Sequence, residues 1–273
     1  MSGPVHRGRV LVIAGSDSGG GAGIQADIKT ITVLGGHAAT AVTAITVQNT
    51  LGVSGVLALP PDLIEAQARA VLDDIGADVI KTGMLGDAAT VARVADLLEA
   101  YRIPAVIDPV MVAKGGQALL ADDAVHTLIT RLLPHATLLT PNAPEAAALT
   151  GLSVETTDDL RRAGSALLER GALAVLMKGG HVSGDRVVDL LLTPEGETLF
   201  EGPRIETRHT HGTGCTLASA VAAGLARGLT LVAAVAQAHA YVAEAIRQAP
   251  GLGTGHGPLD HGWPLRPGAV APG

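Results

Sequence analysis

The sequence predicts an α/β fold in which a mostly parallel sheet is covered by helices on both faces. Strand-like and helix-like segments alternate along most of the chain, as in repeated strand–helix–strand units. Many of the strand-like segments are short, continuous apolar runs, which is typical of strands buried on both faces. Hydrophobic residues make up 47% of the chain and aromatic residues only 1%, so the expected core is aliphatic.

Each element in the first third of the chain is predicted from a local pattern. Strands are expected where apolar or β-branched residues run together, and helices where apolar residues recur every three or four positions. The first strand stops at Gly15, the first helix at Gly35, and Pro61 stands at the start of the second helix. The predicted elements are a strand over 10–14, a helix over 21–34, strands over 38–47 and 53–59, and a helix over 61–74.

The alternation continues through the rest of the chain. Further strands are expected over 78–81, 105–107, 137–139 and 173–177, separated by helices over 87–100, 122–133, 144–149 and 158–170. The turn residues Pro194-Glu195-Gly196 indicate a hairpin between strands over 186–192 and 197–200, and helices over 214–227 and 231–248 follow.

No change of composition marks a linker, so residues 10–260 are expected to form a single domain. Residues 1–9 are expected to be a flexible N-terminus. The chain from Pro250 is rich in Gly and Pro, and residues 261–273 are expected to be a flexible C-terminal tail.

Charge and composition argue against several classes of protein. The formal net charge is 19 − 26 = −7 and there are only four aromatic residues, which disfavours nucleic-acid binding. The single cysteine, Cys215, excludes a disulfide within the chain and a cysteine-based zinc site, and it fits a cytoplasmic location. No apolar run reaches membrane length without charged residues or Gly and Pro breaks, so no membrane association is expected.

Small, polar and acidic residues collect directly after the predicted strands. Ligands of open α/β sheets bind at the carboxyl ends of the strands, so these segments are expected to share one site. They are residues 15–23, 82–84, 108–110, 140–145 and 178–181.

The first of these segments holds five glycines in nine residues, 15–23. Residues 21–26 fit a dinucleotide fingerprint, but no acidic residue lies between Asp27 and Asp62 to bind a ribose. No Gly-Lys-Ser/Thr tripeptide is present, which excludes a Walker A loop. A flexible turn is the alternative interpretation, and we favour close approach of the backbone to a ligand.

The turn His211-Gly212-Thr213-Gly214-Cys215 opens a predicted helix. Glycines allow several N–H groups to point at one anion, and the helix dipole favours negative charge there, so the turn suits a transferring phosphoryl group. A thiol in the first helical turn is expected to have a pKa below about 8.5, and Cys215 could then accept a proton from a substrate hydroxyl. A buried cysteine acting as a small hydrophobic side chain is equally compatible with the sequence.

Other polar residues also leave two interpretations open. Asn142 and Glu145 lie three apart at the start of a helix, where they could hold Mg²⁺ through waters or simply cap the helix. Asp27, Gln48 and Asn49 stand among apolar residues and could read the edge of a heterocycle or form satisfied core contacts. Asp17, Lys81 and Lys114 are expected to be surface or loop charges. The ten histidines show no metal-ligand spacing, and no Gly-x-Ser-x-Gly elbow occurs.

Taken in chain order, several of these sequence segments resemble those of one protein family. The run Ala14-Gly15-Ser16-Asp17-Ser18-Gly19-Gly20-Gly21-Ala22-Gly23-Ile24-Gln25-Ala26-Asp27 closely resembles the opening of the hydroxymethylpyrimidine/phosphomethylpyrimidine kinases of thiamine biosynthesis. Later blocks resemble that family in the same order: Val47-Gln48-Asn49-Thr50, Lys81-Thr82-Gly83-Met84-Leu85, Asp108-Pro109-Val110-Met111, Thr140-Pro141-Asn142-Ala143-Pro144-Glu145-Ala146, Met177-Lys178-Gly179-Gly180-His181, His209-Thr210-His211-Gly212-Thr213-Gly214-Cys215-Thr216 and Gly255-His256-Gly257-Pro258. The resemblance covers about residues 10–260.

The resemblance implies a ribokinase-like three-layer fold and two successive ATP-dependent phosphorylations. The hydroxymethyl group of 4-amino-5-hydroxymethyl-2-methylpyrimidine would become a monophosphate and then a diphosphate, with ATP as phosphoryl donor and Mg²⁺ as cofactor. The implied site residues are Gly15, Asp27, Gln48, Met84, Asp108 and Val110 for the pyrimidine, Cys215 as base, Gly212, Thr213 and Gly214 for the anion hole, Asn142, Lys178, Gly180 and Thr213 for ATP, and Glu145 and Asp108 for Mg²⁺.

The sequence departs from some family members at Asp17-Ser18-Gly19, where those members have Asp-Pro-Ser. Pyridoxal kinases are related, so a vitamin kinase acting on pyridoxal or pyridoxine is an alternative function. A non-catalytic pyrimidine-binding protein is an alternative of a different class. The resemblance also implies a homodimer.

Overall fold

The structure is a computed structural model that describes residues 8–112, 116–117 and 119–269. Over this part of the chain nine strands form one sheet in the order β3-β2-β1-β4-β5-β6-β7-β8-β9. The strands are β1 (Arg9–Ser16), β2 (His37–Asn49), β3 (Gly52–Ala58), β4 (Val79–Thr82), β5 (Ala105–Ile107), β6 (Leu138–Leu139), β7 (Val175–Met177), β8 (Arg186–Thr193) and β9 (Gly196–Pro203). The neighbouring strands β2, β1, β4, β5, β6 and β7 pair in parallel, whereas β3 at one edge and β8 and β9 at the other pair antiparallel with their neighbours.

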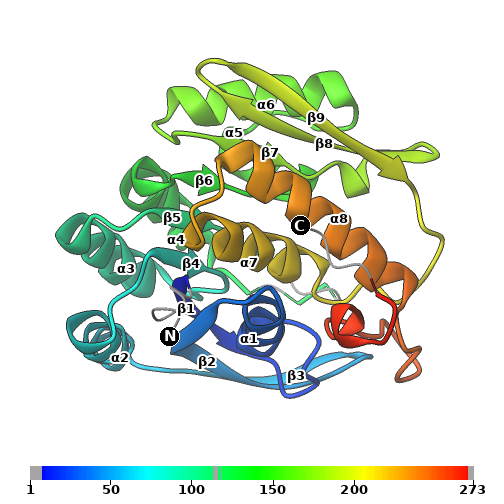
Figure 1. Ribbon diagram of the computed structural model, residues 1–273. Coiled ribbons are helices and arrows are strands. Elements are labelled where there is room, and N and C mark those ends of the chain that lie inside the picture. Colours follow the sequence, from blue (N-terminus) through cyan, green and yellow to red (C-terminus); the bar gives the residue numbers. More distant parts are fainter. Residues whose placement is uncertain (1–7, 113–115, 118, 270–273) are drawn as a thin grey trace, which may run out of the picture.

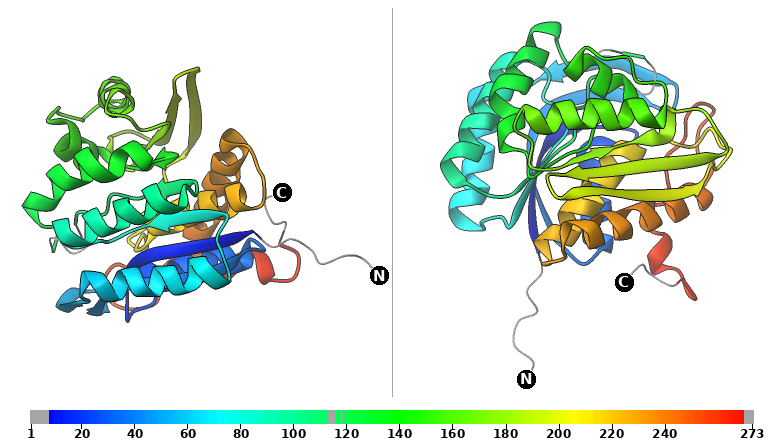
Figure 2. Two further views of the ribbon diagram at one scale, coloured as in Figure 1. Left: turned by 90° about the vertical axis from the view of Figure 1, so that its left-hand side faces the viewer. Right: turned by 90° about the horizontal axis from the view of Figure 1, so that it is seen from above.

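Helices cover both faces of the sheet, so the predicted α/β class and its three layers are confirmed (Figures 1 and 2). The helices are α1 (Gly23–Val33), α2 (Pro61–Asp74), α3 (Ala88–Tyr101), α4 (Asp122–Thr127), α5 (Ala143–Thr150), α6 (Thr157–Glu169), α7 (Thr213–Ala226) and α8 (Leu231–Arg247). Among the described residues, no helix has both the length and the apolar character needed to cross a membrane.

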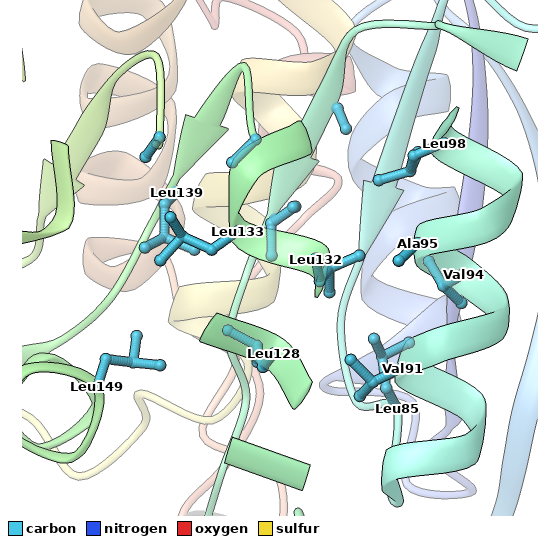
Figure 3. Close-up of a cluster of buried hydrophobic side chains, with 14 of the residues drawn as sticks. Leu85, Val91, Val94, Ala95, Leu98, Leu128, Leu132, Leu133, Leu139 and Leu149 are labelled. Carbon is cyan, nitrogen blue, oxygen red and sulfur yellow. The ribbon is translucent and has the colours of Figure 1, made fainter. Parts of the chain in front are cut away.

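Alternate residues of β1 supply two separate cores. Leu11 and Ile13 belong to the core that α2 to α6 cover, part of which Figure 3 shows between α3 and the sheet. Val10, Val12 and Ala14 belong to the core that α1, α7 and α8 cover. This alternation follows from the two-residue period of a strand, and it explains why a strand buried on both faces is apolar throughout.

The predicted helix over 122–133 is correct in position, but only its first half is α-helical. The α-helix ends at Thr127, and a π-helical turn (Leu128–Leu132) and a 3-10 turn (Leu133–His135) continue it. Pro134 has no N–H to donate and its ring crowds the preceding turn, so regular α-helix cannot continue through it. The backbone widens instead, and the N–H of Leu133 bonds to the carbonyl of Leu128.

The two predicted flexible ends need correction where the structure describes them. Arg9 begins β1 and is held by Asp78, whose Oδ1 lies 2.7 Å from the guanidinium; residues 1–7 lie outside the described part. At the other end Trp263 is buried, its ring stacks on Tyr241, and its Nε1 donates to the Tyr241 carbonyl. The folded unit therefore extends beyond residue 260, because its one Trp supplies a large apolar ring for the α8 surface.

Candidate functional site

A cavity of about 1800 Å³ opens at the carboxyl ends of the central parallel strands. It is bordered by the segments that follow β1, β4, β5, β6 and β7, and by the turn that begins α7. The predicted site residues that line it are Gly15, Gln48, Met84, Asp108, Val110, Asn142, Glu145, Lys178, Gly180, Gly212, Thr213, Gly214 and Cys215. Asp27 is the exception: it is fully buried in α1 and does not line the cavity.

The turn before α7 is built by close contact between two glycine-rich segments. Gly212 is the N-cap residue, with φ 83° in the left-handed region. A Cβ built on Gly212 would lie 1.8 Å from the carbonyl oxygen of Gly21, so no other residue fits there. The Thr216 hydroxyl donates to the Gly212 carbonyl at 2.8 Å, which ties the turn to the helix. Gly214 and Cys215, in the first turn of α7, thus border the cavity at the positive end of a 14-residue helix.

Cys215 lies at this helix start, but the expected low thiol pKa is wrong. Burial raises the pKa of Cys215 to about 11, against the lowering effect of the nearby Lys81 ammonium. Desolvation disfavours the thiolate more than the helix terminus and Lys81 favour it. The thiol therefore carries its proton at neutral pH.

Beneath Cys215 lies a buried ion pair that joins β4 to α1. Lys81 Nζ is 2.9 Å from Asp27 Oδ1, and both side chains have no solvent exposure. Ser219 Oγ of α7 donates to the same Asp27 oxygen at 2.6 Å. Burial opposes ionisation of Lys81, but the pairing with Asp27 outweighs it and raises the pKa of Lys81. Lys81 was expected at the surface; instead it is a cation in the wall of the cavity.

A second charged group, Lys178 with two carboxylates, lies beside the turn that begins α7. Lys178 Nζ lies 2.8 Å from Asp108 Oδ1 and 3.6 Å from Glu145 Oε2. Its pKa is raised, because Asp108 and Glu145 outweigh the effect of burial. A Cβ built on Gly214 would lie 3.2 Å from Lys178 Nζ, so this ammonium faces the start of α7. Lys178 and the helix terminus can therefore act on the same anion.

Asn142 and Glu145 do form a helix cap. Asn142 Oδ1 accepts from the N–H of Glu145, and Glu145 Oε2 accepts from the N–H of Asn142, which is a complete capping box for α5. Glu145 also borders the cavity beside Lys178, so capping does not exhaust its role. Burial raises the pKa of Glu145 and the Lys178 charge lowers it, with burial the larger effect.

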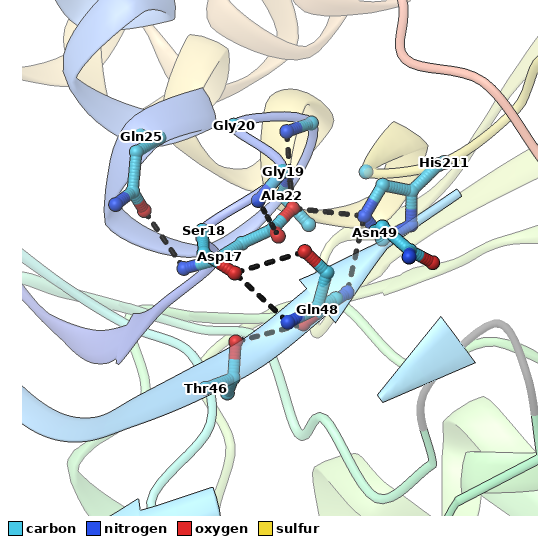
Figure 4. A network of polar contacts seen from close by, with 12 residues as sticks. Asp17, Ser18, Gly19, Gly20, Ala22, Gln25, Thr46, Gln48, Asn49 and His211 are labelled. Carbon is cyan, nitrogen blue, oxygen red and sulfur yellow. Dashed lines mark hydrogen bonds and ion pairs between the residues drawn. The ribbon is translucent and has the colours of Figure 1, made fainter. Parts of the chain in front are cut away.

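The first glycine loop is organised by its own aspartate (Figure 4). Asp17 is buried, and its carboxylate accepts from the N–H groups of Gly19, Gly21 and Ala22 at 2.8–3.0 Å. It also contacts His211 Nε2 at 2.9 Å. Burial raises the pKa of Asp17, but the contacts with His211 and the loop N–H groups outweigh it and lower that pKa.

This arrangement corrects two expectations. Asp17 is not a surface charge, and three of the loop N–H groups serve its carboxylate rather than a ligand. The glycines also allow close packing, since a Cβ on Gly21 would lie 2.5 Å from His211 Cδ2. The bond from Gly19 to the side chain two residues before it is an Asx turn, a local signal that identifies Asp17 as a loop-forming residue.

Sequence reasoning missed the residues that shape the turn around Gly180. Asp189 of β8 accepts from the N–H of Gly179 at 2.9 Å, and Arg204 donates to the Gly180 carbonyl at 3.0 Å. Both line the cavity. No local pattern marks them, because their partners lie 10 and 24 residues away. Lys114, another expected loop charge, lies outside the described residues.

A sequence model of the phosphomethylpyrimidine kinase family matches residues 17–260. The chain is 53% identical over 262 residues to a hydroxymethylpyrimidine/phosphomethylpyrimidine kinase of Streptomyces coelicolor, covering 96% of this chain and 97% of the relative. It is 46% identical over 255 residues to the protein of the same description in Bacillus subtilis, covering 93% of this chain and 94% of that one.

Solved structures show the same fold. A pyridoxal kinase of Staphylococcus aureus, in complex with AMP-PCP and pyridoxal, is 37% identical with a TM-score of 0.87, covering 94% of each chain. A phosphomethylpyrimidine kinase of Clostridium difficile is 40% identical with a TM-score of 0.78, covering 87% of this chain and 99% of that one.

Proposed function

The chain belongs to the phosphomethylpyrimidine kinase family, and on that basis we propose how its cavity transfers phosphoryl groups. The activity is that of a hydroxymethylpyrimidine/phosphomethylpyrimidine kinase of thiamine biosynthesis. We propose ATP as the phosphoryl donor, which is supported by the AMP-PCP and ADP complexes of a related pyridoxal kinase. The alternative of a non-catalytic pyrimidine-binding protein is thereby set aside. The fold is the ribokinase-like fold of the related pyridoxal kinases.

The observation that carries the proposal is that the α7 turn lines one cavity together with the residues expected to bind both substrates. We assign Gln48, Met84 and Gly15 to the pyrimidine, and Gly180 and Asn142 to the nucleotide, and all five line this cavity. Gly214, beside Lys178, lines it as well.

The residues of the turn stabilise the charge of the transferring group. The N–H groups at the start of α7 donate to its equatorial oxygens, and Lys178 adds a fixed positive charge. Because Asp108 and Glu145 hold the ammonium in place, little reorganisation accompanies the reaction. Positioning and charge stabilisation account for most of the catalysis of phosphoryl transfer.

The substrate hydroxyl must lose its proton, and we assign Cys215 as the acceptor. Cys215 lines the cavity at the turn. Its pKa of about 11 means that the thiol must ionise before it can accept that proton, and Lys81 is the cation that favours the thiolate.

The donors present fit Mg²⁺. Among the described residues no three His, Cys, Asp or Glu side chains gather as a metal site. Asp108 and Glu145 nevertheless each place a carboxylate oxygen within 3.6 Å of Lys178 Nζ. Mg²⁺ is commonly held by one or two carboxylates, waters and substrate phosphates, which matches this sparse set. Bound there, the ion would neutralise charge on the nucleotide phosphates.

The direct test is to incubate the purified protein with Mg-ATP and 4-amino-5-hydroxymethyl-2-methylpyrimidine, and to follow mono- and diphosphate by mass spectrometry. We expect both products in sequence. Absence of any phosphorylated product would refute the assignment.

Pyridoxal is the second candidate substrate, favoured by the TM-score of 0.87 to a pyridoxal kinase. Turnover of pyridoxal and of the pyrimidine alcohol should be compared at equal concentrations. We expect the pyrimidine to be preferred, because Gln48 offers an amide to a ring edge that carries an amino group.

We also propose that the protein is a cytoplasmic homodimer. A kinase that consumes ATP works where ATP is supplied. Ile45 and Leu57 pair across β2 and β3, and both are more than half exposed, at 51% and 64%. An apolar face of this kind is typical of an interface. Sedimentation should give twice the monomer mass, and Leu57→Glu should lower it to the monomer mass.

A further inference from the structure

The side-chain amide of Gln48 lies between two partners whose hydrogen-bonding roles are fixed. At one end of the amide Thr46 Oγ1 lies 3.2 Å away, and at the other end His211 Nε2 lies 3.2 Å away (Figure 4). Gln48 also lines the cavity where a pyrimidine would bind.

His211 Nε2 is a donor. It lies 2.9 Å from Oδ2 of the buried Asp17, and an ionised carboxylate can only accept. The same Asp17 oxygen accepts from Gly21 and Ala22, so the carboxylate is held in place and in turn holds the imidazole. The Nε2–H is therefore held toward Asp17, and Nε2 has no lone pair left to accept from the Gln48 amide 3.2 Å away.

Thr46 Oγ1 is an acceptor toward Gln48. Its one hydrogen is donated to the Ser16 carbonyl at 2.8 Å, which leaves lone pairs for the amide. The structure places the amide nitrogen toward His211 and the amide oxygen toward Thr46. In that placement two donors, the Gln48 N–H and the His211 Nε2–H, face each other at one end of the amide. Two acceptors, the Gln48 oxygen and Thr46 Oγ1, face each other at the other end. The opposite orientation removes both conflicts: the amide N–H then donates to Thr46 Oγ1, and the amide oxygen faces the Nε2–H, whose one hydrogen it shares with Asp17.

In this orientation one N–H and one oxygen lone pair of Gln48 remain, side by side, for the cavity. A side-chain amide used in this way pairs with an aminopyrimidine edge, since its oxygen accepts from the amino group and its N–H donates to the adjacent ring nitrogen. The oxygen lies at the His211 end, next to Gly212. A 4-amino group bound there brings the neighbouring 5-hydroxymethyl group to the side of the α7 turn.

We propose that Asp17 and His211 are positioning residues that hold the Gln48 amide in one orientation and thereby select 4-amino over 4-oxo pyrimidine alcohols. A 4-oxo ring presents an acceptor at position 4 and an N–H at position 3, the reverse of the pattern that the held amide accepts. The inference rests on the proposed function, because it concerns the substrate of the same site.

The test compares the 4-amino alcohol with its 4-oxo counterpart in wild type and in His211→Asn. The kcat/KM of the amino alcohol and the inhibition constant of the oxo compound, used as a competitor, are measured with saturating Mg-ATP. Without the fixed donor the Gln48 amide is free to turn. We expect the preference for the amino compound to fall by about tenfold, with tighter binding of the oxo compound as part of that change.

Two further variants keep the result interpretable. Thr46→Val removes the acceptor at the other end of the amide and should shift the preference in the same direction, whether or not His211→Asn folds well. His261→Asn is the matched control, because His261 contacts Thr216 of α7 at 3.0 Å without contacting Gln48, and it should leave the preference unchanged.

An equal loss of affinity for both compounds in His211→Asn and Thr46→Val would overturn the inference, while wild-type turnover of the amino alcohol would still support the proposed function. Wild type that phosphorylates neither alcohol would refute the proposed function and the inference with it.

Discussion

At Cys215, burial and the start of α7 act on the same thiol in opposite directions. Burial is the larger effect and raises its pKa to about 11, although Lys81 opposes it. A base with this pKa is mostly protonated at pH 7. As long as the pH stays below the pKa, the deprotonated, active fraction rises about tenfold for each unit by which the pH is raised.

This predicts a characteristic pH profile. If the Cys215 thiolate accepts the hydroxyl proton, kcat/KM for the pyrimidine alcohol should rise about tenfold per unit from pH 7 to pH 9. Cys215→Ser keeps the size of the side chain but cannot ionise in this range, so its profile should be flat and its activity lower by about 10²–10⁴. A flat wild-type profile, or one that Cys215→Ser reproduces, would exclude the thiolate as the base.

The buried pair Lys81–Asp27 predicts non-additive effects on stability. Asp27→Asn or Lys81→Met alone leaves an unpaired charge in a fully buried position and should cost about 3–5 kcal/mol in the free energy of unfolding. The double variant removes both charges and should cost clearly less than the sum of the two. Urea unfolding of the four proteins measures this, and simple additivity would show that the two groups are not coupled.

At the scale of single elements, the start of α5 carries two functions in one residue. Glu145 completes the capping box with Asn142 and also lies 3.6 Å from Lys178. Glutamine at this position keeps the cap, since Glu and Gln both serve there, but it removes the charge. The two functions can therefore be separated by one substitution.

We expect Glu145→Gln to leave the thermal stability almost unchanged and to raise the Mg²⁺ concentration needed for half-maximal activity severalfold. Thr156→Ala is the control, because it breaks the capping box of α6, whose Thr156 and Asp159 do not line the cavity. It should cost about 1 kcal/mol of stability and leave the Mg²⁺ titration unchanged. An unchanged titration in Glu145→Gln would leave Glu145 with the capping role alone.

At the scale of the whole molecule, the C-terminal segment closes the core beside α8. Tyr241 donates its hydroxyl hydrogen to the His261 carbonyl at 2.7 Å, and Trp263 stacks on the Tyr241 ring. Burial lowers the pKa of His261 to about 4, so its imidazole is neutral where it contacts Thr216 at the base of α7. The segment thus connects the end of the chain to the helix that carries the anion hole.

Trp263→Ala should lower the free energy of unfolding by about 3–5 kcal/mol, as expected for a large aromatic side chain removed from a core. Leu265→Ala, two residues away and 75% exposed, should change it by less than about 0.5 kcal/mol. Denaturant unfolding measures both. Equal, small effects would mean that the segment does not contribute to the fold in solution.

The sequence alone determined the α/β class, the order of the strands and helices, and the residues that gather after the strands. These depend on local periodicity and on the rule that parallel strands present their carboxyl ends at one edge. Helix α2 was predicted at its observed bounds, Pro61–Asp74, because Pro marks its start and its apolar residues recur at helical spacing. The motifs around Gln48, Lys178 and Cys215 pointed to the cavity that the structure contains.

The tertiary structure alone decided which charges are buried and what they contact. Asp17 and Lys81 carry no sequence signal for burial, because their partners His211 and Asp27 lie 194 and 54 residues away. The thiol pKa of Cys215 depends on desolvation by elements that the first helical turn does not reveal. Local sequence thus fixes backbone conformation, while pKa values and hydrogen-bond roles come from groups that only the folded chain brings together.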